Sequence, residues 1–592
     1  MSWFSDLAKT YDSVANIAGM PNEQGKVLWP MCHIAAKTNV AVTIDQNGRF
    51  RHAVAEEMRI IVPCTKESAV RGSEPHALHD QLKYLTVSEM YLDLLKNWKD
   101  SHPKVDAVYK YVVGGSLIKD LQNSEISTKD DKIFVRFRVE IPGDSEPNLW
   151  EDKGVIKAWQ DYCETQNSEM RDLCYATGNV ENVLTKHYKG INVAAANAKL
   201  VSSSDKDNYT YRGRFKKATE ANAISADASC KTHAMLNYII ETQAYRSGTQ
   251  AIAAWNIDSG KPEHSPFESS FGLVHGKSQN DLTNAEIVLD SDYSKNWRSL
   301  LMGTGNVKSL KNRLSRVAVM AVDAATTGRM GITFYQNLPE NDYIERIVNW
   351  HETCAWHFRR NGQNYVSAPS ANRIINVVYG EPKSGNDEGY KKIQKLARER
   401  LLYHIICGEP LNRSWIKAAT ERVSRQHSYE SETAWLDAIS VTCALVRKYY
   451  HRKGEEFSLN LEKDRQDRSY LFGRLLAIGD RLESHARYLQ AGGEDKRPTN
   501  AVRYMSAFAA KPLRTWKLIF DQLNPYIQRL DGAEWYQRQI DEVMSLFNEG
   551  DFDDRQLDGR YLMGYSLQRL EFFNKKDEDK NKEENNESDQ EN

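Results

Sequence analysis

The sequence predicts an α+β protein with a strand-rich N-terminal region, a mixed α/β middle region and a C-terminal all-α helical bundle. Residues 131–143, DKIFVRFRVEIPG, alternate apolar and polar side chains as a half-buried strand does. Beyond residue 385 nearly every segment has helical periodicity instead. At 592 residues and 40% apolar composition, the chain is long enough for several cores. We therefore expect domains over residues 1–150, 151–385 and 386–573, followed by a tail over 574–592.

Strand signals dominate the N-terminal region. Residues 40–64 contain the β-rich segments VAVTIDQNGRF and RIIVPC, and the Asn47-Gly48 step is typical of a hairpin turn. In the middle region, the patterns predict a helix over residues 231–245 and short strands over 202–215 and 330–335. Glycine and proline divide the C-terminal region into helices, with breaks expected at Gly408–Pro410, Gly492–Pro498, Pro512 and Asn524–Pro525.

The helix expected over residues 468–490 has two rows of side chains. The apolar row, which should pack in a core, consists of Leu471, Leu475, Ile478, Leu482 and Leu489. The second row is aromatic and basic, because steps of four and seven residues return to nearly the same angle, and consists of Tyr470, Arg474, Arg481 and Tyr488. Gly473 and Gly479 each cost about 1 kcal/mol relative to alanine inside a helix. They indicate that another backbone approaches, either a bound strand or partner, or a tightly crossed helix.

Bulk charge neither favours nor excludes nucleic acid as a partner. The formal net charge is −2, but the last nineteen residues contain eight acids and four lysines. This tail has no apolar side chain, so we expect it to be disordered and to confer solubility. Charges within the first nine residues and the lack of long apolar runs argue against a signal peptide and a membrane span. Eight cysteines without a CxxC pair suit reduced thiols, so we expect a cytoplasmic protein.

The sequence contains few signals for catalysis, and it predicts no cofactor and no metal. The phosphate-loop, nucleophile-elbow and HExxH motifs are absent. His351, Cys354 and His357 could ligate a metal if they shared a helix face, but three mixed ligands favour ordinary packing. His79-Asp80, with His76 nearby, resembles a metal-dependent phosphohydrolase dyad without the further histidines that such a site needs. A binding protein is therefore favoured over an enzyme.

Signals for nucleic-acid binding are stronger. In the segment NYTYRGRFKKATEA, cations that can neutralise phosphates alternate with aromatic rings that can stack on bases: Tyr209, Tyr211, Arg212, Arg214, Phe215, Lys216 and Lys217. The alternative is an exposed strand end with solubilising charges. Lys66 and Arg71 lie on a loop after the strand IIVPC, where recognition residues are common. Lys511, Arg514 and Lys517 form a further basic row, although such rows are usually the solvated face of a helix.

At these residues the chain resembles the large subunit of the type I-C CRISPR surveillance complex, Cascade, of the Csd family. The similar segments follow one another in the family's order over most of the chain. They are Ile61-Val62-Pro63, YRGRF at 211–215, KTHAMLNYIIETQAY at 231–245, GRMGITFYQNL at 328–338, VNWHETCAW at 348–356, SYLFGRLLAIGDRLE at 469–483 and GYSLQRLEFF at 564–573. The loop after Pro63 departs from the family pattern, because Arg71 and Pro75 are two residues closer together and His76 stands where asparagine is usual.

The resemblance implies a protein that reads the protospacer-adjacent motif (PAM) on target double-stranded DNA and promotes R-loop formation, while guide RNA supplies sequence specificity by pairing. The implied motif-binding residues are Lys66, Arg71, Ser73 and His76. The expected strand-binding residues are Tyr209, Tyr211, Arg212, Arg214, Lys216, Lys217, Tyr470, Arg474, Arg481, Tyr488, Lys511, Arg514 and Lys517. The implied partners are guide RNA, target DNA, the backbone, guide-processing and small Cascade subunits, and an effector nuclease-helicase.

Two alternatives differ in class from this interpretation: a metal-dependent nuclease using His76, His79 and Asp80, and a structural RNA-protein scaffold without target contact. The resemblance also implies that the C-terminal region is made separately, by translation from inside the same gene, as a small subunit. No methionine lies between Met330 and Met505, so such a start would require a non-methionine codon at a residue such as Leu459 or Leu461.

Overall fold

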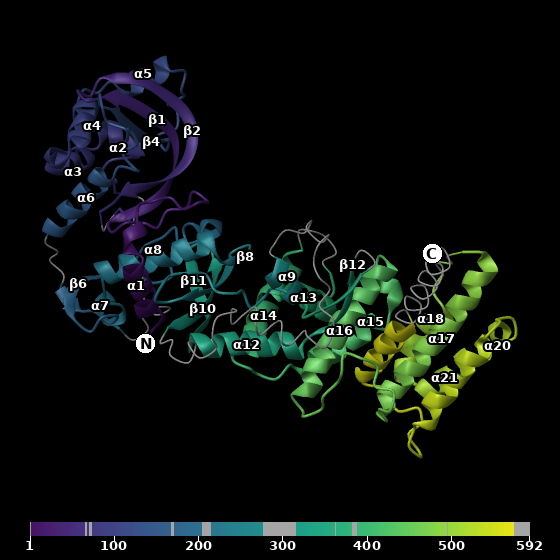
Figure 1. The fold of residues 1–592 in the computed structure, drawn as a ribbon. Coiled ribbons are helices and arrows are strands. Elements are labelled where there is room, and N and C mark those ends of the chain that lie inside the picture. The colour runs from purple at the N-terminus through teal and green to yellow at the C-terminus, as the bar shows by residue number, and fades with distance from the viewer. Residues whose placement is uncertain are drawn as a thin grey trace, which may run out of the picture. The chain divides into compact units, whose positions relative to one another are not determined.

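A computed structural model describes most of the chain, in two compact units (Figure 1). The first unit comprises Met1–Ser265 and Leu314–Glu340, and the second comprises Pro266–Arg313 and Asn341–Asn592. The predicted α+β class is confirmed. The boundaries between the two units do not coincide with the domain boundaries expected near residues 150 and 385. The expected domains over residues 1–150, 151–385 and 386–573 stay a prediction. The described residues are 2–65, 68–69, 74–166, 171–203, 215–275, 315–360, 363–381, 387–493, 495 and 497–572.

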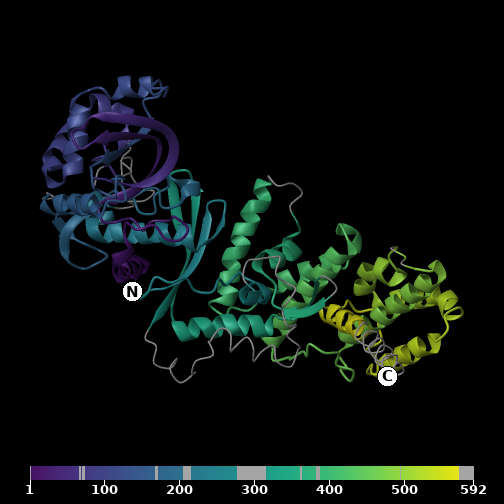
Figure 2. The same ribbon diagram turned by 45° about the horizontal axis from the view of Figure 1, so that its top comes forward.

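The predicted N-terminal hairpin and strand form one sheet of the first unit. β1 (His33–Asp45) pairs antiparallel with β2 (Phe50–Pro63) and parallel with β4 (Phe134–Glu140), which also pairs with the short β3 (Asp80–Gln81). Figures 1 and 2 show β1 and β2 as a strongly curved ribbon. Gly48 turns between them with a φ of +76°, where L side chains are strained.

Helices complete the core beside this sheet. Val42, Phe137 and other strand residues pack with Trp98, Val108 and Trp159 of the helices. These helices and their neighbours are α2 (Leu82–Val87), α3 (Glu89–Trp98), α4 (Pro103–Val113), α5 (Leu117–Asn123) and α6 (Lys153–Thr165).

A second sheet of the first unit joins distant parts of the sequence. Its antiparallel order is β11-β10-β9-β8. The strands are β8 (Tyr245–Ser247), β9 (Gln250–Asn256), β10 (Arg316–Thr326) and β11 (Arg329–Pro339), which contains the predicted strand 330–335. The predicted helix 231–245 is observed as α8 (Ala226–Thr242), which packs on α1 (Trp3–Ser13). Smaller elements are β5 (Arg171–Leu173), β6 (Val180–Leu184), β7 (Ile224–Ser225) and α7 (Ala218–Ala221). The predicted strand 202–215 lies mostly outside the described residues.

The second unit is helical apart from one hairpin, within the part of the chain that the structure describes. The hairpin consists of β12 (Trp356–Arg360) and β13 (Gln363–Ser367). The first group of helices is α9 (Ser270–His275), α12 (Glu340–Thr353), α13 (Ala371–Tyr379), α14 (Glu388–Ile405), α15 (Arg413–Val423) and α16 (Glu432–His451). The second is α17 (Arg468–Ala491), α18 (Asn500–Arg503), α19 (Met505–Ala510), α20 (Pro512–Ile527), α21 (Ala533–Ser545) and a helix over residues 560–572.

Most of the predicted helix breaks are observed. Gly408 and Gly492 have positive φ, and Pro512 occupies the first turn of α20. The break expected at Asn524–Pro525 is wrong, because α20 continues to Ile527. Pro525 lies in the last turn of α20, so only a short stretch of helix follows the proline. None of the helices among the described residues combines the length and apolar character needed to cross a membrane.

Candidate nucleic-acid interface

Three of the four predicted motif-binding residues, Lys66, Arg71 and Ser73, lie outside the described residues. His76 is half-buried, its backbone N–H donates to Asp80 Oδ2 at 2.6 Å, and its Nδ1 lies 3.2 Å from Ser68 Oγ. Burial lowers the pKa of His76 to about 4. The ring is therefore neutral near pH 7, so it could contact a base edge but would add no charge toward a phosphate.

His79 and Asp80 have structural partners in the first sheet. His79 is fully buried and its Nδ1 accepts a hydrogen bond from the backbone N–H of Phe137 at 3.1 Å. Asp80 accepts backbone hydrogen bonds from His76 and Gln81, and burial raises its pKa to about 7. No cluster of three potential metal ligands occurs within the described ranges. The geometry thus favours packing and loop-fixing roles for these side chains.

The other candidate ligand set does not share a helix face. His351 is on α12 and contacts Ser270 Oγ at 2.7 Å, whereas Cys354 follows the end of that helix. His357 is on β12, and its Nε2 donates to the carbonyl of Leu459 at 2.6 Å. The expected ordinary packing accounts for all three residues.

Only the end of the YRGRF segment is described. Tyr209, Tyr211, Arg212 and Arg214 lie outside the described residues. The backbone N–H groups of Lys216 and Lys217 donate to Glu220 Oε2 at 2.9 and 3.2 Å, which fixes the start of α7. Both lysine residues are exposed at the surface, beside the carboxylate of Glu220.

The long helix α17 is buried over more of its circumference than the sequence predicts. Leu471, Leu475, Ile478 and Leu482 are buried as expected, but Leu489 is 56% exposed. Tyr470 and Arg474, which were predicted to face a bound strand, are buried too. Arg474 donates to Gln568 Oε1 at 2.9 Å and to the carbonyl of Lys463 at 2.6 Å. The predicted surface row is therefore wrong in its N-terminal half.

A close helix crossing is the physical reason for this correction. A Cβ added at Gly473 would lie 1.9 Å from the carbonyl oxygen of Tyr561, and one at Gly564 would lie 2.1 Å from that of Tyr470. The helix over residues 560–572 thus packs backbone to backbone on α17 and covers Tyr470 and Arg474. The crossed-helix explanation for Gly473 is confirmed. The partner glycine, Gly564, was not singled out, although it lies in the quoted segment GYSLQRLEFF.

The C-terminal half of the predicted row, Arg481 and Tyr488, lines a cavity of about 530 Å³ in the second unit. Tyr488 is 51% exposed. The cavity walls come from residues 426–432 between α15 and α16, from α17, from residues 495–502 and from the end of the helix over residues 560–572. One half of the predicted row therefore has a concave surface beside it.

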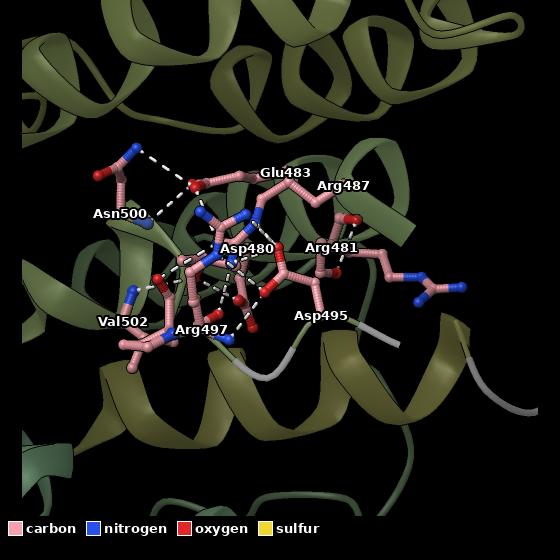
Figure 3. Close-up of polar contacts among 11 residues, drawn as sticks. Asp480, Arg481, Glu483, Arg487, Asp495, Arg497, Asn500 and Val502 are labelled. Atoms are coloured by element: carbon pink, nitrogen blue, oxygen red, sulfur yellow. Dashed lines mark hydrogen bonds and ion pairs between the residues drawn. The ribbon is translucent and has the colours of Figure 1, made fainter. Parts of the chain in front are cut away.

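A buried polar network fixes one wall of this cavity (Figure 3). Glu483 Oε2 accepts the backbone N–H of Asn500 at 2.7 Å. Arg487 pairs with Asp495 at 2.9 Å and donates to the carbonyl of Arg497 at 2.9 Å. Asp480 accepts from Thr499 Oγ1 at 2.7 Å, and from Tyr565 and Arg569 on the C-terminal helix. These bonds attach the segment 495–500 to α17.

The acids of this network and Arg487 are not among the residues predicted from the sequence. Burial raises the pKa of Glu483, while the N–H of Asn500 and the charge of Arg487 oppose that shift. Hydrogen bonds from Arg497 hold the pKa of Asp495 well below its usual range. The available signal was the i, i+4 spacing of Glu483 and Arg487 within an otherwise apolar helix face.

The third predicted basic row is on the surface. Lys511, Arg514 and Lys517 are all exposed at the start of α20, and the side chain of Arg514 is 83% exposed with Asp554 at 3.9 Å. Their distribution along the first turns of α20 suits phosphate contacts, and the solvated-face alternative stays open.

Comparison with known protein families identifies a match over nearly the whole chain. A family model described as CRISPR-associated protein (Cas_Csd1) matches residues 7–573. No curated protein matches the chain.

Proposed function

Because the chain belongs to the Csd1 family of CRISPR-associated proteins and is thus a Cascade subunit, we propose that it is the large subunit of a type I-C complex. In this role it reads the protospacer-adjacent motif on duplex DNA and promotes R-loop formation with the guide RNA. It also supports recruitment of the effector nuclease-helicase. The observation that carries the proposal is the family match, which extends over residues 7–573 and so includes most of both units.

Exposed cations support a role at nucleic acid. Lys216 and Lys217 of the first unit, and the basic row of α20 in the second, are positioned to neutralise phosphates. The overall charge is near zero, so this binding depends on local clusters rather than on a general positive field.

The proposal assigns no catalytic step to this chain. The nuclease alternative requires His76, His79 and Asp80 to bind a metal ion, but His79 Nδ1 and both carboxylate oxygens of Asp80 already receive backbone hydrogen bonds. The scaffold alternative requires that the assembled complex ignore the motif. The two alternatives therefore predict different results in one DNA-binding experiment.

The experiment measures binding of the assembled complex to two duplexes that differ only in the motif, at fixed salt and with and without Mg²⁺. We expect motif-dependent binding and no cleavage by the complex alone. Replacing Lys66 and Arg71 by alanine should weaken binding, and should also relax motif selectivity if either side chain contacts bases. Equal affinity for both duplexes would favour the scaffold, and Mg²⁺-dependent cleavage abolished by Asp80→Asn would favour the nuclease.

A further inference from the structure

We propose that the cavity beside Arg481 and Tyr488 accepts one unpaired nucleobase of a single strand. This inference rests on the proposed function, since it names the chemical group that this part of the second unit would bind. The sequence row predicted contacts along a helix, whereas the structure provides a concave site with walls from four segments.

The size and lining of the cavity suit a planar, largely uncharged group. Its volume of about 530 Å³ is within the ~300–1,000 Å³ that is usual for small-molecule sites. Several rings line it and can provide stacking surfaces: His427, Tyr429, His485, Tyr488 and Phe572. Every base has a π face, so rings of this kind bind bases with little dependence on sequence.

The charges in the walls disfavour a phosphate inside the cavity. The lining acids are Glu430, Glu432, Asp480 and Asp495, and the lining arginines are Arg481, Arg497 and Arg569. Asp480 is paired with Arg569, and Asp495 with Arg497. Because four acids line the cavity against three arginines, a dianionic or monoanionic group gains little there. A neutral base can instead exchange hydrogen bonds with polar side chains such as Gln426, Ser431 and Ser484.

The polar network holds one wall of the cavity in place. The side chain of Arg497 is 75% exposed, and Arg481 extends away from the polar network in Figure 3. The wall that carries Arg497 is held by the buried bonds of Glu483 and Arg487, so the site is formed before a ligand arrives.

The test uses the full-length chain and fluorescently labelled oligothymidylate, together with a strand of equal length in which abasic sites replace the bases. We expect the wild-type protein to bind oligothymidylate at least about fivefold more tightly than the abasic strand. Tyr488→Ala should remove most of that difference, and Tyr488→Phe should preserve it. Leu489→Ala is the matched control, since Leu489 is the exposed neighbour of Tyr488 on the same helix and does not line the cavity.

Several results would overturn the inference. Equal affinity for the two strands would show that only phosphates are bound, and no affinity for either would show that the cavity does not bind a strand. If Leu489→Ala reduced the preference for oligothymidylate as much as Tyr488→Ala does, the effect would belong to the helix surface and not to the cavity. Motif-dependent duplex binding by the assembled complex, measured separately, distinguishes these outcomes from failure of the proposed function.

Discussion

At the scale of single residues, helix α17 has an apolar row in the core and, beside it, polar side chains that neighbouring segments cover. The pattern of Leu471, Leu475, Ile478 and Leu482 predicted burial, because an apolar stripe at helical spacing has few other uses. Tyr470 and Arg474 could not be placed in the same way. A tyrosine or arginine is found both at surfaces and in hydrogen-bonded cores, and its partners here, at residues 462 and 568, depend on chain segments that periodicity does not describe.

The two glycines of α17 provide a matched pair of substitutions. A Cβ at position 473 would meet the backbone carbonyl of Tyr561 at 1.9 Å, which the crossing helix can relieve only by moving away. At position 479 the nearest atoms are side-chain carbons of Leu523 and Trp516 at 3.4 Å, an ordinary contact distance. We expect Gly473→Ala to lower the free energy of unfolding of the second unit by about 1–3 kcal/mol or more.

Gly479→Ala should be neutral or slightly stabilising, because alanine is favoured over glycine inside a helix by about 1 kcal/mol. Denaturant titration followed by tryptophan fluorescence would measure both variants. Equal losses of stability for the two would contradict the backbone crossing as the reason for glycine at position 473.

At the scale of elements, the sequence predicted α17 to within one residue, but it did not predict what surrounds this helix. Its apolar row and length follow from local periodicity. Some of its polar contacts come from residues 497 and 498, which follow the turn at Gly492 and offer carbonyl groups to Arg487. Loop conformations of this kind depend on tertiary bonds rather than on propensity, so the cavity that they form was not predictable.

Two arginines around Asp495 test the importance of this polar network. Arg487 is buried and bonds to Glu483, Asp495 and two carbonyls, whereas Arg497 is largely exposed and pairs with the same aspartate. Breaking a buried pair typically costs about 3–5 kcal/mol, because the partner charge is left without compensation. We therefore expect Arg487→Met to lower the melting temperature of the second unit and to increase hydrogen exchange in residues 480–500.

Arg497→Met is the control for this prediction. An exposed substitution usually changes stability by no more than about 0.5 kcal/mol. A melting temperature lowered equally by both variants, or by neither, would show that the buried bonds of Arg487 do not stabilise the segment 495–500.

At the scale of the whole chain, the class could be predicted, but the division into units could not. The α+β class could be predicted because the periodicity of a strand or a helix is a property of a short stretch of sequence. The first unit, however, is completed by β10 and β11, which return after a separation of some sixty residues to pair with β9. Such long-range pairing has no signature in a single sequence, and it explains why the boundary expected near residue 385 does not coincide with a unit boundary.

The C-terminal helices raise a related question, which is whether residues from about 459 to 573 form a separate product of the same gene. Contacts of α17 with α18, α20, α21 and the helix over residues 560–572 give this part of the chain a core of its own. Its last helix also packs on the preceding helices. Tyr561 Oη lies 2.6 Å from Ser424 Oγ, and Ser566 accepts a hydrogen bond from Trp356.

We therefore expect a recombinant fragment beginning at Leu459 to be helical by circular dichroism, but to melt at a lower temperature than the second unit does in the full chain. It should self-associate, because the face around Tyr561 and Tyr565, buried in the full chain, would be uncovered. Circular dichroism and light scattering test both expectations, and a monomeric fragment of unchanged melting temperature would contradict the role of these contacts. Mass spectrometry of a complex expressed from one large-subunit gene then tests the separate product. If no C-terminal polypeptide accompanies the full chain, translation from inside the gene does not occur here, whatever the fragment's ability to fold.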